Sequence, residues 1–103
     1  MEKILVSKFR SRRQARFVRR RLHKSLVPEH LRAVNVFVTE KDEIFVGVVL
    51  APRVPVHIEV FVETILGEGQ KVEMTLDEFI EASLKAKEAY IGGASKTFPA
   101  VKP

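Results

Sequence analysis

The sequence predicts an α+β domain with an antiparallel-rich sheet of four to five strands and two helices packed on one face. Three observations lead to this prediction. Short β-branched segments with alternating side chains are separated by turn residues, two stretches have helical periodicity, and the elements follow in the order β-α-β-β-β-(β)-α. Such a mixture, without a regular βαβ alternation, is typical of helices packed against an antiparallel sheet.

The first third of the chain is predicted to contain one strand and one helix. Residues 3–9 are sufficiently apolar and β-branched for a strand. Residues 10–26 contain no Gly or Pro and are rich in good helix formers. Pro28 then ends the helix, because the residue before a proline disfavours helical geometry. One apolar stripe runs along this helix, formed by Ala15, Val18, Leu22 and Leu26.

The middle of the chain reads as a succession of strands. Residues 33–39 and 43–50 are predicted strands around a polar turn, and 54–66 alternates apolar and polar side chains as a half-buried strand does. Residues 71–74 form a short fifth strand in a hairpin with 54–66. Both faces of the strands at 33–39 and 43–50 are apolar. This predicts either an oligomer or partner surface, or a sheet that is curled or covered by the tail.

The second helix is predicted to begin after Thr75. The pattern from Thr75 to Glu78 matches a capping box, in which each side chain bonds a free backbone N–H of the other residue. The helix is expected to continue to about Ile91 and to stop at the following glycines. Its inner face is predicted to contain Phe79, Ile80, Ser83, Leu84, Tyr90 and Ile91. Residues 1–93 then form a single domain, and 94–103 a loose tail.

Composition restricts the function classes. The chain has 103 residues and no Cys, which excludes disulfides, Cys-based zinc sites and thiol chemistry. No apolar run approaches the roughly 20 residues of a membrane helix, so no membrane association is expected. Residues 3–28 are Arg-rich and free of acids, as transit peptides are, but the fold needs them, and a cytoplasmic location is the expectation. Few thermolabile side chains suggest a thermophilic source.

The positive charge lies almost wholly at the beginning of the chain. Residues 1–33 contain 11 Lys or Arg and two acids, a net charge of +9, whereas residues 34–103 have a net charge of −4. The helix at 10–26 contains no acid. Its cations repel one another at i, i+4, and three of them lie at the N-terminal end, where the helix dipole favours anions. A local rule broken without visible compensation indicates a functional surface.

Three interpretations of this basic helix remain open. The favoured one is a DNA- or RNA-binding surface that contacts mainly phosphates, because Arg grips phosphate through two hydrogen bonds and stacks on bases. The second is a protein-interaction or accessory module with an acidic partner, or a homodimer formed through the apolar sheet face. The third is a solvated face that neutralises Glu59, Glu63 and Glu73. The predicted nucleic-acid-binding residues are Arg10, Arg12, Arg13, Arg16, Phe17, Arg19, Arg20, Arg21 and Lys24.

Phe17 has two interpretations of its own. It lies among the cations on the helical wheel, where it could stack on an exposed base or wedge into a groove. The favoured alternative is core packing beneath the 27–33 loop. No sequence motif indicates base-specific reading, so the helix is expected to lie along or in a groove.

Nothing in the chain indicates catalysis, and no enzyme activity, cofactor or metal is expected. His23, His30 and His57 are scattered over a predicted helix, loop and strand, without metal-ligand spacing. Glu59 and Glu63 share a predicted strand face, where paired carboxylates are more often solvated than catalytic.

Overall fold

Eight elements follow one another along the chain in the computed structural model, which describes residues 3–92. They are β1 (Lys3–Phe9), α1 (Arg12–Ser25), β2 (Leu31–Val38), β3 (Ile44–Leu50), α2 (Val56–Leu66), β4 (Gln70–Val72), α3 (Leu76–Leu84) and β5 (Glu88–Gly92). Ser11 begins α1, because its hydroxyl accepts a hydrogen bond from the backbone N–H of Gln14.

The five strands form one sheet in the order β4-β1-β3-β2-β5, and every neighbouring pair is antiparallel. Only β2 and β3 are neighbours both in the chain and in the sheet. The segment from β1 through α1 to β2 therefore crosses over β3, and the segment from β3 through α2 to β4 crosses over β1. The first six elements thus have the split βαβ, or ferredoxin-like, arrangement, to which α3 and β5 are added.

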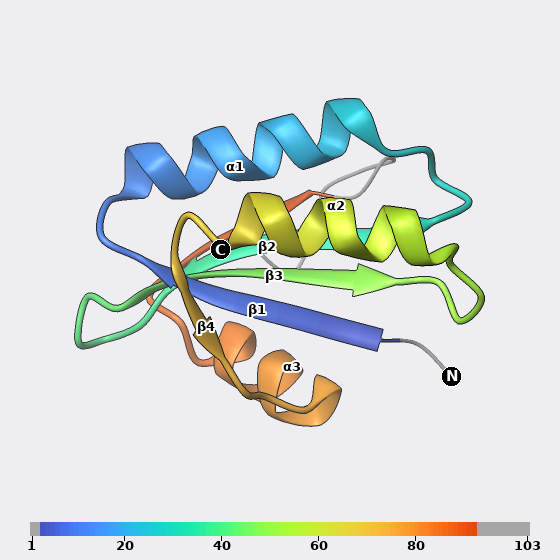
Figure 1. The fold of residues 1–103 in the computed structure, drawn as a ribbon. Coiled ribbons are helices and arrows are strands. Elements are labelled where there is room, and N and C mark those ends of the chain that lie inside the picture. Colours follow the sequence, from blue (N-terminus) through green and yellow to red (C-terminus); the bar gives the residue numbers. More distant parts are fainter. Residues whose placement is uncertain (1–2, 93–103) are drawn as a thin grey trace.

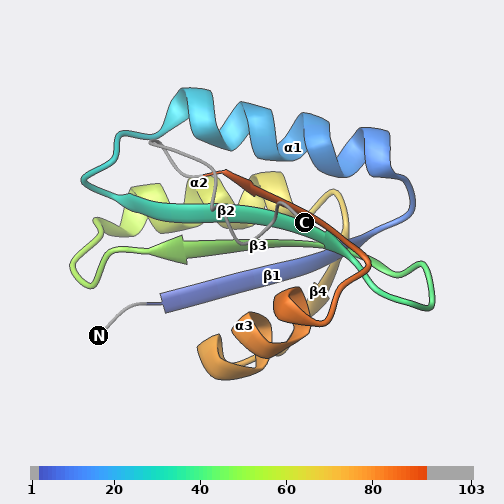
Figure 2. The same ribbon diagram turned by 180° about the vertical axis from the view of Figure 1, so that it is seen from behind.

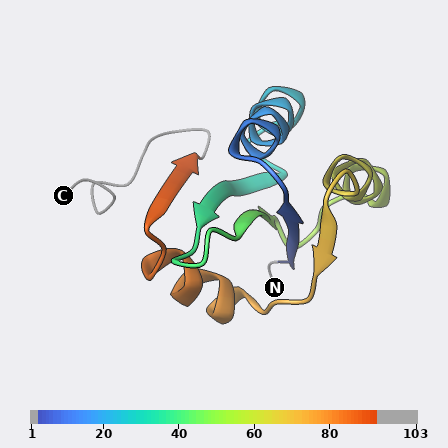
Figure 3. The same ribbon diagram turned by 90° about the vertical axis from the view of Figure 1, so that its left-hand side faces the viewer.

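Helices cover both faces of the sheet. α1 and α2 lie side by side over one face, and α3 lies on the opposite face (Figures 1 and 2). The end-on view separates the three layers (Figure 3). The predicted α+β class and antiparallel sheet are confirmed. Two helices do share one face, but the second of them is α2, and the residues of the predicted second helix contribute α3 on the other face.

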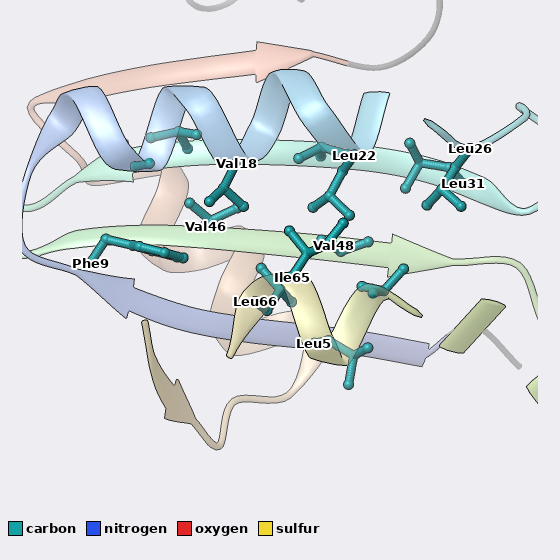
Figure 4. Packing of buried hydrophobic residues seen from close by; sticks show 14 of the residues in the cluster. Leu5, Phe9, Val18, Leu22, Leu26, Leu31, Val46, Val48, Ile65 and Leu66 are labelled. Carbon is teal, nitrogen blue, oxygen red and sulfur yellow. The ribbon is translucent and has the colours of Figure 1, made fainter. Parts of the chain in front are cut away.

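The larger part of the core lies beneath α1 and α2. Ala15, Val18 and Leu22 are fully buried, and Leu26 follows them at the end of α1, so the predicted apolar stripe is confirmed. This stripe packs on the side chains that β2 and β3 direct to the same face, and Ile65 and Leu66 of α2 complete the cluster (Figure 4). Burial of one such aliphatic side chain contributes about 1.5–3 kcal/mol.

The opposite sheet face is also apolar, and α3 covers it. Phe37 and Phe45 stack with ring centroids 5.2 Å apart, and Phe79 of α3 lies 5.3 Å from Phe37. Gly47 makes this contact feasible, because a Cβ atom there would lie 2.2 Å from the Phe79 ring. α3 therefore covers the part of this face around Phe37 and Phe45, so the prediction of an open oligomer surface there was wrong. The predicted cover by the tail falls on residues outside those described.

The prediction of a strand at 54–66 was wrong. Residues 56–66 form α2, which buries Val62, Ile65 and Leu66 and leaves Val56 and Val60 exposed. The buried positions have helical spacing, which the alternation of β-branched residues concealed. Packing against β1 and α1 overrides the β propensity of the valines. The predicted hairpin is absent as well, since β4 pairs with β1.

The second predicted helix was too long. α3 has the predicted capping box but ends at Leu84, and residues 88–92 form β5 against β2. Of the predicted inner face Phe79 is buried, whereas Ile80 and Leu84 are exposed. The backbone N–H of Lys87 bonds the carbonyl of Val38, which starts the pairing that replaces helix. The predicted tail at 94–103 lies outside the described residues.

Candidate functional site

The predicted site residues lie on or next to α1, but the fold gives them different environments. Arg10 precedes α1, and the remaining residues from Arg12 to Lys24 belong to it. Because Ala15, Val18 and Leu22 face the sheet, the other side chains divide between two flanks and an outer side. One flank faces β5 and the other faces the C-terminal end of α2. On the flanks, Arg12, Arg16 and Arg21 have partners among the described residues, and the cations on the outer side have none.

On the β5 flank, Arg12 forms a bidentate bond with Glu88. Its Nε lies 3.0 Å from Oε1 and its Nη2 lies 2.8 Å from Oε2, while Asp42 Oδ1 lies 3.8 Å from Nη2. The hydrogen bonds to Glu88 raise the pKa of Arg12, and those from Arg12 lower the pKa of Glu88. One turn further along, the guanidinium of Arg16 stacks 5.5 Å from the centre of the Tyr90 ring. Both arginines thus tie α1 to β5.

On the α2 flank, Arg21 lies 3.5 Å from the carboxylate of Glu68. Arg19 follows Arg16 by three residues and therefore lies on the β5 side of α1. It is half-buried, and its Nε is buried without a hydrogen-bond partner in the described part of the chain. Burial lowers the pKa of Arg19, and the neighbouring charges of Arg20 and Arg16 lower it further. Arg19 is therefore a cation in the middle of α1 without an acidic partner among the described residues.

Arg10 precedes α1 and is separated from Arg12 by the N-cap residue Ser11. It lines a polar hollow of about 610 Å³ together with Lys8, Gln14, Glu68 and Gln70. It is exposed and has no acidic partner among residues 3–92.

The outer side of α1 carries Arg13, Phe17, Arg20 and Lys24, which we call the outer ridge. Their spacing of four, three and four residues places them in one line along the helix, opposite the buried stripe. All four side chains are exposed. Within residues 3–92, none of the three cations forms an ion pair with an acid. The outer ridge is therefore a line of free positive charge around one aromatic ring.

Phe17 is 54% exposed, so its predicted place in the core was wrong. Exposure alone does not single it out, because Val56 and Leu84 are exposed to 75%. Phe17 differs from these residues in its neighbours, because cations precede it by four residues and follow it by three and seven. The helical wheel contained this signal, because Phe17 falls far from the stripe of Val18 and Leu22.

Neutralisation of the helix by the rest of the domain is partial and uses other acids than expected. Glu59 pairs with Lys3 and Glu73 with Lys71, so these acids do not compensate α1. The acids that do so are Asp42, Glu68 and Glu88. Sequence reasoning missed them, because Glu88 is 76 positions from Arg12 and no local pattern connects the two.

Two other common kinds of functional site, an open RNA-binding sheet face and a metal-binding cluster, are not found among the described residues. RNA-binding sheets present aromatic side chains on an open face, whereas α3 covers Phe37 and Phe45 here. Among the described residues no group of three or more His, Asp or Glu side chains is arranged to hold a metal ion.

No helix within residues 3–92 is both long enough and apolar enough to cross a membrane.

Comparisons with protein-family models, with curated proteins and with solved structures find no match for this chain.

Proposed function

We propose that the protein binds nucleic acid through the outer ridge of α1, mainly by contacts to phosphates. One observation carries this proposal: Arg12, Arg16 and Arg21 on the flanks of α1 have partners in the domain, whereas the exposed cations Arg13, Arg20 and Lys24 have none among the described residues. Acids from distant elements pair with the flanks of α1, but none of those described pairs with its outer side.

The free charge is energetically unfavourable for the isolated domain. Arg13 lies in the first turn, where the helix dipole disfavours a cation by roughly 0.3–1 kcal/mol. Arg20 and Lys24 repel each other at i, i+4 by about 0.2–0.5 kcal/mol. A polyanion along the ridge reverses the sign of both contributions. Arginine is also suited to phosphate, because its planar group donates two parallel hydrogen bonds.

The test is binding of fluorescent oligonucleotides at several salt concentrations. If the three ridge cations each contact a phosphate, the slope of log K against log salt is about −2 for single strands and about −3 for duplex DNA. The combined variant Arg13→Gln, Arg20→Gln, Lys24→Gln is expected to lose binding and to keep the fold, because none of these side chains is buried.

A matched control removes the same charge elsewhere. Lys41, Arg53 and Lys71 are exposed cations outside α1, and their triple replacement by Gln is expected to change affinity by about threefold or less. Equal losses in the two triple variants, or binding that ignores salt, would contradict the proposal. An acidic protein partner predicts instead that polyglutamate competes as well as an oligonucleotide of equal charge.

A further inference from the structure

The charges on the two flanks of α1 indicate which kind of nucleic acid the outer ridge would bind. Glu88 and Asp42 lie along the β5 flank, and Glu68 lies along the α2 flank. Each of these carboxylates lies beside a flank arginine and offsets part of the positive charge of its flank. On the outer ridge between them, the three cations are exposed and none of them pairs with a carboxylate of residues 3–92.

This charge distribution is unfavourable for insertion into a duplex groove. A helix in the major groove has a phosphate backbone on each side, so both of its flanks need to be attractive to anions. Here both flanks present carboxylates. In addition, α2 lies beside α1 in the same layer (Figure 3), so α1 does not project alone from the domain. The major groove of A-form RNA is too narrow for side chains to read in any case.

The outer ridge suits a single strand. Arg13 and Lys24 are 11 residues apart, which is about 16 Å along a helix, or the length of about five stacked nucleotides. A strand that follows this line has its phosphates beside the three cations and clear of the flank carboxylates. Phe17 lies within the line and is 54% exposed. Its ring can stack directly on a base whose face is open, whereas in a duplex it would first have to separate two stacked base pairs.

We infer that the ligand of the outer ridge is a single-stranded polynucleotide with one unpaired base stacked on Phe17. This inference rests on the proposed function and narrows it to one class of nucleic acid. Ribose and deoxyribose strands share the phosphate spacing and base faces on which the inference depends.

The experiment compares a short single strand with the duplex of the same sequence at one salt concentration, using the wild type and Phe17→Leu. Leucine keeps an apolar side chain and helix propensity but removes the ring. We expect the wild type to prefer the single strand. We expect Phe17→Leu to weaken single-strand binding about tenfold, as loss of one stacked base does, and to change duplex binding less than twofold.

Leu84→Ala serves as the control, because Leu84 is an exposed apolar residue on α3, on the far face of the sheet. Its affinities should equal those of the wild type. A strand containing 2-aminopurine adds a direct readout, since its fluorescence is expected to fall on binding to the wild type and to change less with Phe17→Leu. Parallel DNA and RNA strands show which sugar is preferred.

Two results overturn the inference and leave the proposed function intact: a duplex bound as tightly as the single strand, or salt-dependent single-strand binding that Phe17→Leu does not weaken. Absence of salt-dependent binding to every oligonucleotide overturns both. The urea midpoint of Phe17→Leu should match that of the wild type, which excludes loss of fold as the cause of any change.

Discussion

The helices α1 and α3 contrast in how they use charge. In α3, Thr75 and Glu78 form a reciprocal capping box, and Asp77 adds a second acid to the first turn. Each of these features stabilises a helix N-terminus. In α1, the first turn contains Arg12 and Arg13 and no acid. Both helices nevertheless bury an apolar face against the sheet, so the difference lies only on their solvent sides.

This contrast shows that fold and proposed binding occupy different sides of one helix. The inward stripe of α1 is as completely buried as Phe79 of α3, and Arg12 and Arg21 reach acids elsewhere in the domain. On the outer ridge, the departure from local electrostatic rules has no such compensation within residues 3–92. Substitutions on the ridge should therefore change ligand binding without loss of fold, whereas substitutions in α3 should change stability alone.

The strongest test of this separation compares two phenylalanines. Phe79→Ala removes a buried ring and is expected to lower the free energy of unfolding by about 3–5 kcal/mol. Phe17→Ala removes an exposed ring and should change it by about 0.5 kcal/mol or less. Urea unfolding followed by circular dichroism measures both. Similar losses in the two variants would break the comparison.

A smaller effect is expected at Gly47, beneath α3. A methyl group there would meet the Phe79 ring at 2.2 Å, so Gly47→Ala should cost about 1–3 kcal/mol through overpacking. In the double variant Gly47→Ala, Phe79→Ala the clash disappears, and the combined loss should be less than the sum of the two single losses. Additive losses would show that α3 does not rest on this glycine.

The pH dependence of stability should depend on the β5 flank. Hydrogen bonds from Arg12 and Lys87 lower the pKa of Glu88 and Asp42 below their ordinary values of 4.5 and 3.8. Because the unfolded chain protonates first on acidification, this stabilisation is complete above the ordinary values and is lost as the pH falls through the lower folded values. We expect the urea midpoint to fall between about pH 5 and about pH 3, and to fall less in Arg12→Gln. Arg13 has no acidic partner within residues 3–92, so the variant Arg13→Gln should keep the pH profile of the wild type.

The smallest effect is expected from giving α1 the acid that α3 has. Gln14 occupies the position of α1 that corresponds to Glu78 in α3. Gln14→Glu should raise the free energy of unfolding by about 0.3–1 kcal/mol through the helix dipole. The same added charge beside the outer ridge should weaken oligonucleotide binding. A variant that gains stability and keeps its affinity would show that this end of α1 does not contact the ligand.

Sequence reasoning was correct where the signals are local. β1, the buried stripe of α1, and the β2 and β3 strands follow from short periodic patterns, and Thr75 and Glu78 locate the start of α3. It was wrong at 54–66, where Val56, Val60 and Val62 satisfy strand alternation while Val62, Ile65 and Leu66 satisfy helical spacing. Length was the neglected signal, since 13 residues are more typical of a helix than of a strand.

The candidate site was predicted only as a set of residues. All of its cations were identified from the sequence, but their division into flanks and outer ridge depends on Glu68, Glu88 and Tyr90, which come from distant elements. The position at which α3 ends also depends on a distant element. Residues 88–92 become a strand because β2 offers an unpaired edge, and that edge exists only once the sheet has formed.

The strand order also has a consequence for synthesis on the ribosome. The β2–β3 hairpin emerges early, with Phe37 and Phe45 together on one face. Their cover, Phe79, emerges more than 30 residues later, and β5 later still. During that interval the nascent chain exposes an aromatic surface and an open strand edge, which are the features that chaperones recognise and that promote aggregation. α3 and β5 thus cover the aromatic surface and the strand edge that the earlier elements leave exposed.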